Sequence, residues 1–103
     1  MARNINIGNV AMVFSGSATG SAVPIKDSSK GTVYTMRLYG TTGNQMEVRG
    51  AFPGDSWSDA QTICTLTVGD PDPVNNPQST TRQFAYPILM IEGTGTIKIA
   101  RGE

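Results

Sequence analysis

Histidine is absent from this sequence, so the side chain that most often moves protons near neutral pH is missing. Neither a Ser-His-Asp nor a Cys-His catalytic arrangement can form. A serine could still pair with Lys26, Lys30 or Lys98, and Asp55 could pair with Asp59, but no nucleophile-elbow or phosphate-binding motif supports either arrangement. We therefore expect no enzymatic activity and no cofactor.

Cysteine occurs once, as Cys64, which excludes an intrachain disulfide and leaves a cysteine-based metal site in need of several chains. The residue lies in the alternating segment 62–68, where it shares a face with Leu66 and Val68. Unpaired cysteine is among the most buried residue types. We expect a buried, inert thiol, with a reactive thiol as the alternative.

Charge is also scarce, and it balances: eight Lys and Arg face eight Asp and Glu, so the net charge is zero. No basic field is available to hold nucleic acid or an anionic membrane. No apolar run approaches the ~20 residues of a membrane-spanning helix, and the N-terminus lacks the apolar core of a signal peptide. We expect neither a nucleic-acid nor a membrane partner, and a chain made in a cytoplasm.

Alternation of apolar and polar residues dominates what is present, whereas no long segment combines helical spacing with freedom from Gly, Pro and β-branched interruption. The pattern predicts strands over residues 4–7, 10–15, 21–26, 32–39, 45–51, 61–68, 80–85, 88–92 and 96–101. The apolar positions of these strands predict the core: Met36, Leu38, Met46, Val48, Cys64, Leu66, Leu89, Ile91, Ile97 and Ile99. In the strand 45–51 and beyond it, the alternation places Phe52 on the same face as Met46 and Val48.

Regularly spaced short strands predict one all-β domain over residues 1–103, an antiparallel β-sandwich of jelly-roll or immunoglobulin-like type. The connections 41–44 and 93–95 are short and contain glycine, so each is expected to close a hairpin. Segment 86–91 is apolar on both faces, which indicates a central strand covered by the opposite sheet and by something else, such as a neighbouring subunit.

Two segments are predicted to bind partners. Residues 1–10 form an arm or edge strand too short to hold a sheet alone, which gains most by pairing with a neighbour's edge; its contacts would come from Asn4, Ile5, Asn6 and Ile7. The loop 69–79 is stiffened by three prolines, which lowers the entropy lost on docking. Its contacts would come from Asp70, Pro71, Asp72, Pro73, Val74, Asn75, Asn76 and Pro77.

Asp70 and Asp72 could instead offer oxygens to Ca²⁺, together with Asn75 or Asn76. Asp before Pro is also simply turn-forming, and the spacing matches no calcium loop. We therefore expect no metal and keep the two aspartates as weak candidates.

The only tryptophan, Trp57, follows a turn and permits two interpretations. It could close one end of the sandwich, which is the commoner role. It could also be a glycan contact that stacks on a sugar, most convincingly if Tyr34, Tyr39 or Tyr86 lay beside it.

The segment from Met46 to Ala60 resembles a pattern in small virion structural proteins of tailed bacteriophages, where a strand ends in a Gly- or Asp-containing turn and a Trp precedes the next strand. In those proteins a segment like 84–91 follows, then a glycine turn and a terminal alternating strand like 95–101. The order and spacing agree over about the C-terminal two thirds of the chain.

The resemblance implies a non-enzymatic β-sandwich on a phage virion, as a capsid decoration (cement) or head-fibre component or, alternatively, a tail component. Its partners would be the major capsid protein or another virion protein, and further copies of itself in a homo-oligomer. The alternatives from other classes are a cellular carbohydrate-binding β-sandwich that uses Trp57 and tyrosines, and an enzyme subunit without a site of its own.

Overall fold

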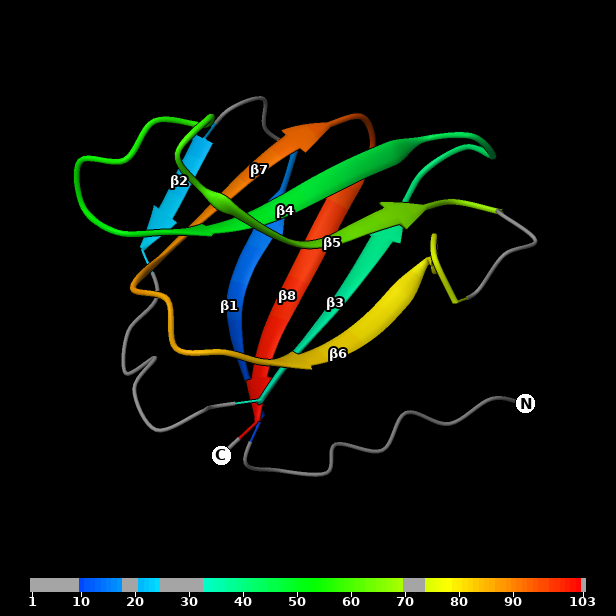
Figure 1. Ribbon diagram of the computed structural model, residues 1–103. Helices are drawn as coiled ribbons and strands as arrows, with labels where there is room; N and C mark the ends of the chain where they lie inside the picture. The colour runs from blue at the N-terminus through cyan, green and yellow to red at the C-terminus, as the bar shows by residue number, and fades with distance from the viewer. Residues whose placement is uncertain (1–9, 18–20, 25–32, 70–73, 103) are drawn as a thin grey trace.

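The computed structural model describes residues 10–17, 21–24, 33–69 and 74–102 of the chain. These residues form β1 (Val10–Gly16), β2 (Ser21–Pro24), β3 (Val33–Tyr39), β4 (Gln45–Ala51), β5 (Gln61–Thr67), β6 (Ser79–Gln83), β7 (Ile88–Gly93) and β8 (Thr96–Gly102). The first sheet has the order β1-β8-β3-β6 and the second sheet the order β2-β7-β4-β5, and the two pack face to face (Figure 1). No helix occurs in the described residues, and so none that could cross a membrane.

The strand pairing identifies the sandwich as a jelly roll. β1 pairs with β8, β2 with β7, β3 with β6 and β4 with β5, all antiparallel. The chain is thus one long hairpin with its tip at the β4–β5 connection, and the β3–β8 and β4–β7 ladders join its four strand pairs into two sheets. Eight strands in this order are the double-sheet jelly roll. The predicted antiparallel β-sandwich is confirmed.

The two short glycine turns, 41–44 and 93–95, do not close hairpins, so that prediction is wrong. Each carries the chain from one sheet to the other, since β3 and β8 belong to the first sheet and β4 and β7 to the second. The two strands that each turn joins bury their apolar faces against each other across the sandwich, so the turn is a corner between the sheets. At the 93–95 corner, Gly93 has a φ of 146°, and a Cβ there would overlap the Gln45 carbonyl oxygen.

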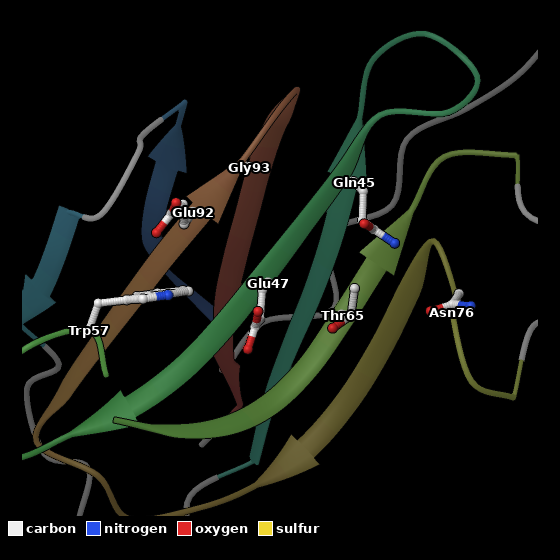
Figure 2. Close-up of a pocket in the computed structure, with 7 residues that line it drawn as sticks. All are labelled: Gln45, Glu47, Trp57, Thr65, Asn76, Glu92 and Gly93. Atoms are coloured by element: carbon white, nitrogen blue, oxygen red, sulfur yellow. The ribbon is translucent and has the colours of Figure 1, made fainter. Parts of the chain in front are cut away.

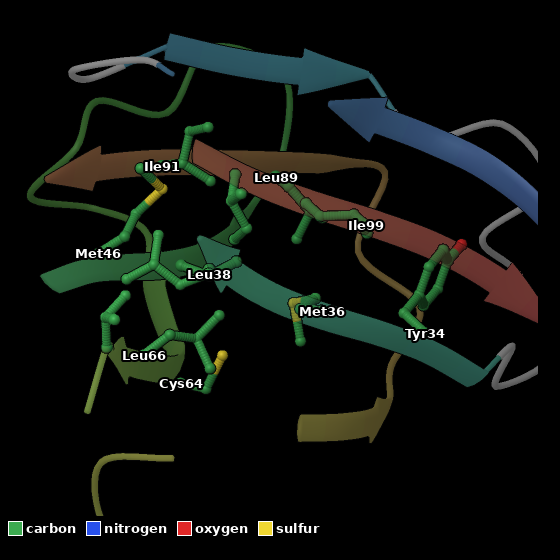
Figure 3. Packing of buried hydrophobic residues seen from close by; sticks show 12 residues of the cluster. Tyr34, Met36, Leu38, Met46, Cys64, Leu66, Leu89, Ile91 and Ile99 are labelled. Atoms are coloured by element: carbon green, nitrogen blue, oxygen red, sulfur yellow. The ribbon is translucent and has the colours of Figure 1, made fainter. Parts of the chain in front are cut away.

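The core lies between the sheets, where side chains from both inner faces interdigitate (Figure 3). The ten residues predicted for it are all buried. Tyr34, which the prediction omitted, is fully buried at the start of β3, two residues before Met36. Burial raises the pKa of the Cys64 thiol to about 11, as expected for an inert cysteine.

β7 lies between β2 and β4, so the prediction of a central strand is confirmed. Met90, on its outer side, is buried as well. Phe52 is 59% exposed, so its predicted place on the inner face with Met46 is wrong. The alternation stops there because β4 ends at Ala51, and the Phe52 amide enters a turn instead, donating to Asp55 Oδ2 (2.9 Å).

One end of the sandwich, which we call the backbone-bonded end, is closed by main-chain hydrogen bonds between connections. Gly43 N donates to Val68 O (2.9 Å), and Val68 N donates to Asn44 O (2.9 Å). Thr94 N donates to Gln45 O (2.8 Å). These bonds tie the 41–44 and 93–95 corners to the strands beside them.

The opposite end, which we call the aromatic end, is closed by rings. Tyr34 stacks on Phe84 with centroids 4.4 Å apart, and Phe84 lies 6.4 Å from Tyr86. Phe52 meets Tyr86 edge-on at 5.9 Å. Tyr86 also lies directly on the backbone of Gly50, where a Cβ would overlap its ring. This end is the one that carries the β4–β5 connection, residues 52–60 (Figure 1).

Candidate functional site

The β4–β5 connection presents Trp57 on the outer face of the second sheet. Two carboxylates hold the turns of this connection. Asp55 Oδ2 accepts a hydrogen bond from Phe52 N, and Asp59 Oδ2 accepts hydrogen bonds from Ser56 N (3.1 Å) and Ser56 Oγ (2.9 Å). The backbone hydrogen bond from Ser56, followed by the side-chain one, lowers the pKa of Asp59. Each aspartate therefore serves a separate turn of the connection.

Arg49 holds the indole in place. Its guanidinium carbon lies 4.2 Å from the centre of the Trp57 ring, within cation–π range. Arg49 Nη1 also donates to the Trp57 carbonyl (2.7 Å), and Nε donates to Glu47 Oε2 (2.7 Å). Since the ring and its own backbone are bound to one side chain, the indole is preorganised.

Glu47 anchors that arginine. Its Oε2 accepts a second hydrogen bond, from Thr62 Oγ1 (2.7 Å). The hydrogen bond from Arg49 is the main reason that the pKa of Glu47 lies below its ordinary value. Within the described part of the chain both bonds go to Oε2, so Oε1 keeps its lone pairs for other donors.

Beside the indole the outer face is hollowed into a shallow depression of about 530 Å³ (Figure 2). Two carboxylates, two amides and a hydroxyl accompany the aromatic ring around it. The lining residues are Gln45, Glu47, Trp57, Thr65, Asn76, Glu92 and Gly93. They come from β4, β5, β7 and two connections, so only the folded sandwich brings them together.

The tyrosines do not join Trp57. Tyr34 is in the core, Tyr86 lies on Gly50, and Tyr39 is on the first sheet, so none of the three lines the depression. The half-buried indole is not part of the core cluster either. The end that Trp57 was expected to close is filled by the aromatic cluster instead, because Tyr34 and Phe84 reach it from the inner side.

The outer face of the first sheet is a second candidate surface, which we call the basic–apolar face. Tyr39 is 39% exposed, with Arg37 5.3 Å and Lys98 4.9 Å from its ring centre. Met12 and Val33, 61% and 42% exposed, lie on the same side of this sheet. Three of the five exposed large hydrophobic side chains among the described residues therefore share one face.

Most of the predicted partner-binding residues lie outside the described ranges: Asn4 to Ile7 and Asp70 to Pro73. Of the rest, Val74 is 81% exposed, Asn76 lines the depression, and the Pro77 carbonyl accepts from Thr67 N (3.0 Å). Pro77 thus fastens the end of its loop to β5.

The metal candidates Asp70 and Asp72 also fall outside those ranges, as do Lys26 and Lys30. Among the residues that the structure does describe, no group of three or more His, Cys, Asp or Glu side chains could hold a metal ion. Lys98 lies beside Tyr39, on the basic–apolar face.

Two features escaped the sequence interpretation. The basic–apolar face had a signal, since the alternation of β3 sets Val33, Arg37 and Tyr39 opposite the buried Met36 and Leu38. The depression had almost none, because Glu92 and Thr65 acquire their neighbours only through the β4–β7 and β4–β5 ladders.

No protein-family model, curated protein or solved structure matches this chain.

Proposed function

We propose that this chain is a non-enzymatic structural protein of a bacteriophage virion, a capsid decoration or head-fibre component that attaches through the basic–apolar face. The observation that carries the proposal is the gathering of Met12, Val33 and Tyr39 beside Arg37 and Lys98 on one sheet face. Aromatic residues, Met and Arg are the types enriched in protein interfaces.

The charges on this face define the partner. Arg37 and Lys98 flank Tyr39, and neither makes an ion pair with another described residue. A particle protein that presents carboxylates here, with apolar groups opposite Met12 and Val33, would satisfy both parts of the surface. The major capsid protein is the expected occupant, since a decoration protein is attached to the capsid shell.

The fold supports this class by analogy only. Double-sheet jelly rolls occur in viral capsid and lectin domains, and a fold does not by itself define a function. A small domain whose edge strand β6 carries three hydroxyl side chains and a single charge, Arg82, suits repeated assembly, and the proposal includes a homo-oligomer. The segment 2–10 and the loop 70–79 are proposed as further attachments, and deletion of residues 2–9 tests the first of them.

The test is binding of the recombinant chain to capsids of the phage whose genome encodes it, prepared without this protein. We expect co-sedimentation at many copies per particle, and detection of the chain in gradient-purified virions by mass spectrometry. Absence from purified virions together with absence of capsid binding would overturn the proposal.

A charge-reversed variant, Arg37→Glu with Lys98→Glu, should reduce capsid binding at least about tenfold, because it places carboxylates against carboxylates. Arg82→Glu is the control for a charge reversal elsewhere on the same sheet: it reverses one charge on β6, at a position that pairs with the buried Tyr34 and so does not belong to the basic–apolar face. Equal binding of both variants and the unmodified chain would show that attachment uses another surface.

A further inference from the structure

We infer that the depression on the second sheet is a carbohydrate site, which binds a neutral sugar with Trp57 as its stacking platform. The inference is independent of the proposed function, because the depression and the basic–apolar face lie on opposite outer faces of the sandwich. It requires neither a virion nor a partner protein.

The platform is the first argument. A sugar offers a face of C–H groups that packs on an aromatic ring, and such packing is strongest when the ring is already immobile. Trp57 is bound to Arg49 twice, through its ring and through its carbonyl. Figure 2 shows the indole extending over the outer face towards Glu47 and Glu92.

The polar groups around the ring are the second argument. A sugar hydroxyl both donates and accepts hydrogen bonds, so a protein site that binds a sugar combines carboxylates, which accept, with amides, which do both. Glu92 and Asn76 make no side-chain hydrogen bond to any described residue, and Glu47 keeps one oxygen uncommitted. Glu92, Asn76 and Glu47 Oε1 thus line the depression with groups that make no hydrogen bond to another described residue.

The charge and the volume of the depression limit the class of ligand that it can bind. Glu47 is neutralised by Arg49, whereas Glu92 has no cation paired with it in the described part of the chain, so an acidic sugar would be repelled. A volume of about 530 Å³ falls within the range of small-ligand sites, ~300–1,000 Å³, and its polar lining offers no slot for a large apolar side chain. A neutral hexose or N-acetylhexosamine unit, alone or at a chain end, fits both constraints.

The probe is an array of neutral and acidic oligosaccharides, followed by titration of the best neutral sugar. Because Trp57 is the only tryptophan, its fluorescence reports binding at this place. We expect retention on neutral sugars and a saturable change in Trp57 emission. Retention on acidic glycans alone, or on none of the array, would overturn the inference.

Two variants locate the site. Trp57→Ala should weaken binding by about tenfold or more on the array, as for an aromatic anchor. Glu92→Gln keeps the shape of an exposed side chain and the fluorescent reporter, so a loss of affinity cannot be ascribed to unfolding; unchanged affinity in both variants would overturn the assignment. Tyr39→Ala, on the opposite face, should leave sugar binding intact, and the Arg37→Glu, Lys98→Glu variant should do so as well while failing on capsids.

Discussion

The two ends of the sandwich are closed by different means. At the backbone-bonded end, main-chain groups of residues 43–45, 68 and 94 bond to one another, and the side chains of Asn44 and Thr94 accept further main-chain hydrogen bonds, from Thr41 N and Gln45 N. At the aromatic end, Tyr34, Phe84 and Tyr86 fill the space between the sheets. The first end depends on backbone conformation and the second on side-chain volume, so different substitutions should damage them.

The difference matters for the candidate carbohydrate site. The hairpin tip that carries Trp57 begins at Phe52, which contacts Tyr86, and it is fastened to the sheet through Arg49. Loss of the aromatic cluster would therefore disturb the platform, whereas strain at the backbone-bonded end would reach it only through global stability.

The largest effect is expected from Tyr34→Ala at the aromatic end. Removing a fully buried ring that stacks on Phe84 should cost about 3–5 kcal/mol of unfolding free energy, a large part of the ~5–15 kcal/mol of a typical domain. Urea denaturation measures it. Tyr34→Phe, which keeps the stacked ring, is the control and should cost far less.

If Tyr34→Ala and Tyr34→Phe had similar free energies of unfolding, ring packing would not be what stabilises this end. The conclusion that the aromatic end depends on side-chain volume would then be wrong.

A smaller effect is expected from Gly93→Ala at the backbone-bonded end. The residue has a φ of 146°, and a new Cβ would overlap Gln45 O and lie 2.6 Å from Met46 Cα, both backbone atoms that cannot swing away. Such strain costs about 1–3 kcal/mol before the overlap is counted. Thermal unfolding followed by circular dichroism measures the loss.

Gly43→Ala separates the cost of a positive φ from the cost of steric overlap at the new Cβ. Its φ of 97° is also positive, yet no atom lies within 4 Å of the new Cβ, so only the left-handed strain of about 1–2 kcal/mol remains. Gly93→Ala should be clearly the more destabilising of the two. The reverse order would mean that the corner at Gly93 relaxes more easily than its contacts indicate.

Within the described ranges, the sequence was sufficient for the strands and the core because period-2 alternation is a local signal: Met36, Leu38, Leu66 and Ile99 each show their burial in their own segment. It was not sufficient for the corners. A glycine turn such as 93–95 has the same local chemistry whether it closes a hairpin or crosses between sheets, and only the non-local ladders decide.

Fewer residues of the candidate carbohydrate site than of the core could be predicted from the sequence. Trp57 and Asn76 were singled out from the sequence, but Glu47, Thr65 and Glu92 belong to ordinary alternating strands. Their convergence follows from strand order, which the sequence pattern does not state. The N-terminal arm and residues 70–73 remain predictions, since they lie outside the described ranges.

The smallest expected effect is a loosening of the hairpin tip in acid, which the backbone-bonded end should not share. Arg49 lowers the pKa of Glu47 below its ordinary value of 4.5. A carboxyl whose pKa is lower in the folded state contributes stability that is complete above the unfolded pKa and is lost as the pH falls through the folded pKa. Because the pair is partly exposed, this contribution is expected to be below about 1 kcal/mol.

Trp57 fluorescence measures this step, because protonated Glu47 releases Arg49 and with it the indole. We expect the emission of the folded protein to change below pH 4.5 and Glu47→Gln to remove the part of that change due to Glu47. A residual step would belong to Asp59, whose carboxylate accepts hydrogen bonds from Ser56 in the same loop. An identical titration in Glu47→Gln would show that the Glu47–Arg49 ion pair has no part in positioning the tryptophan.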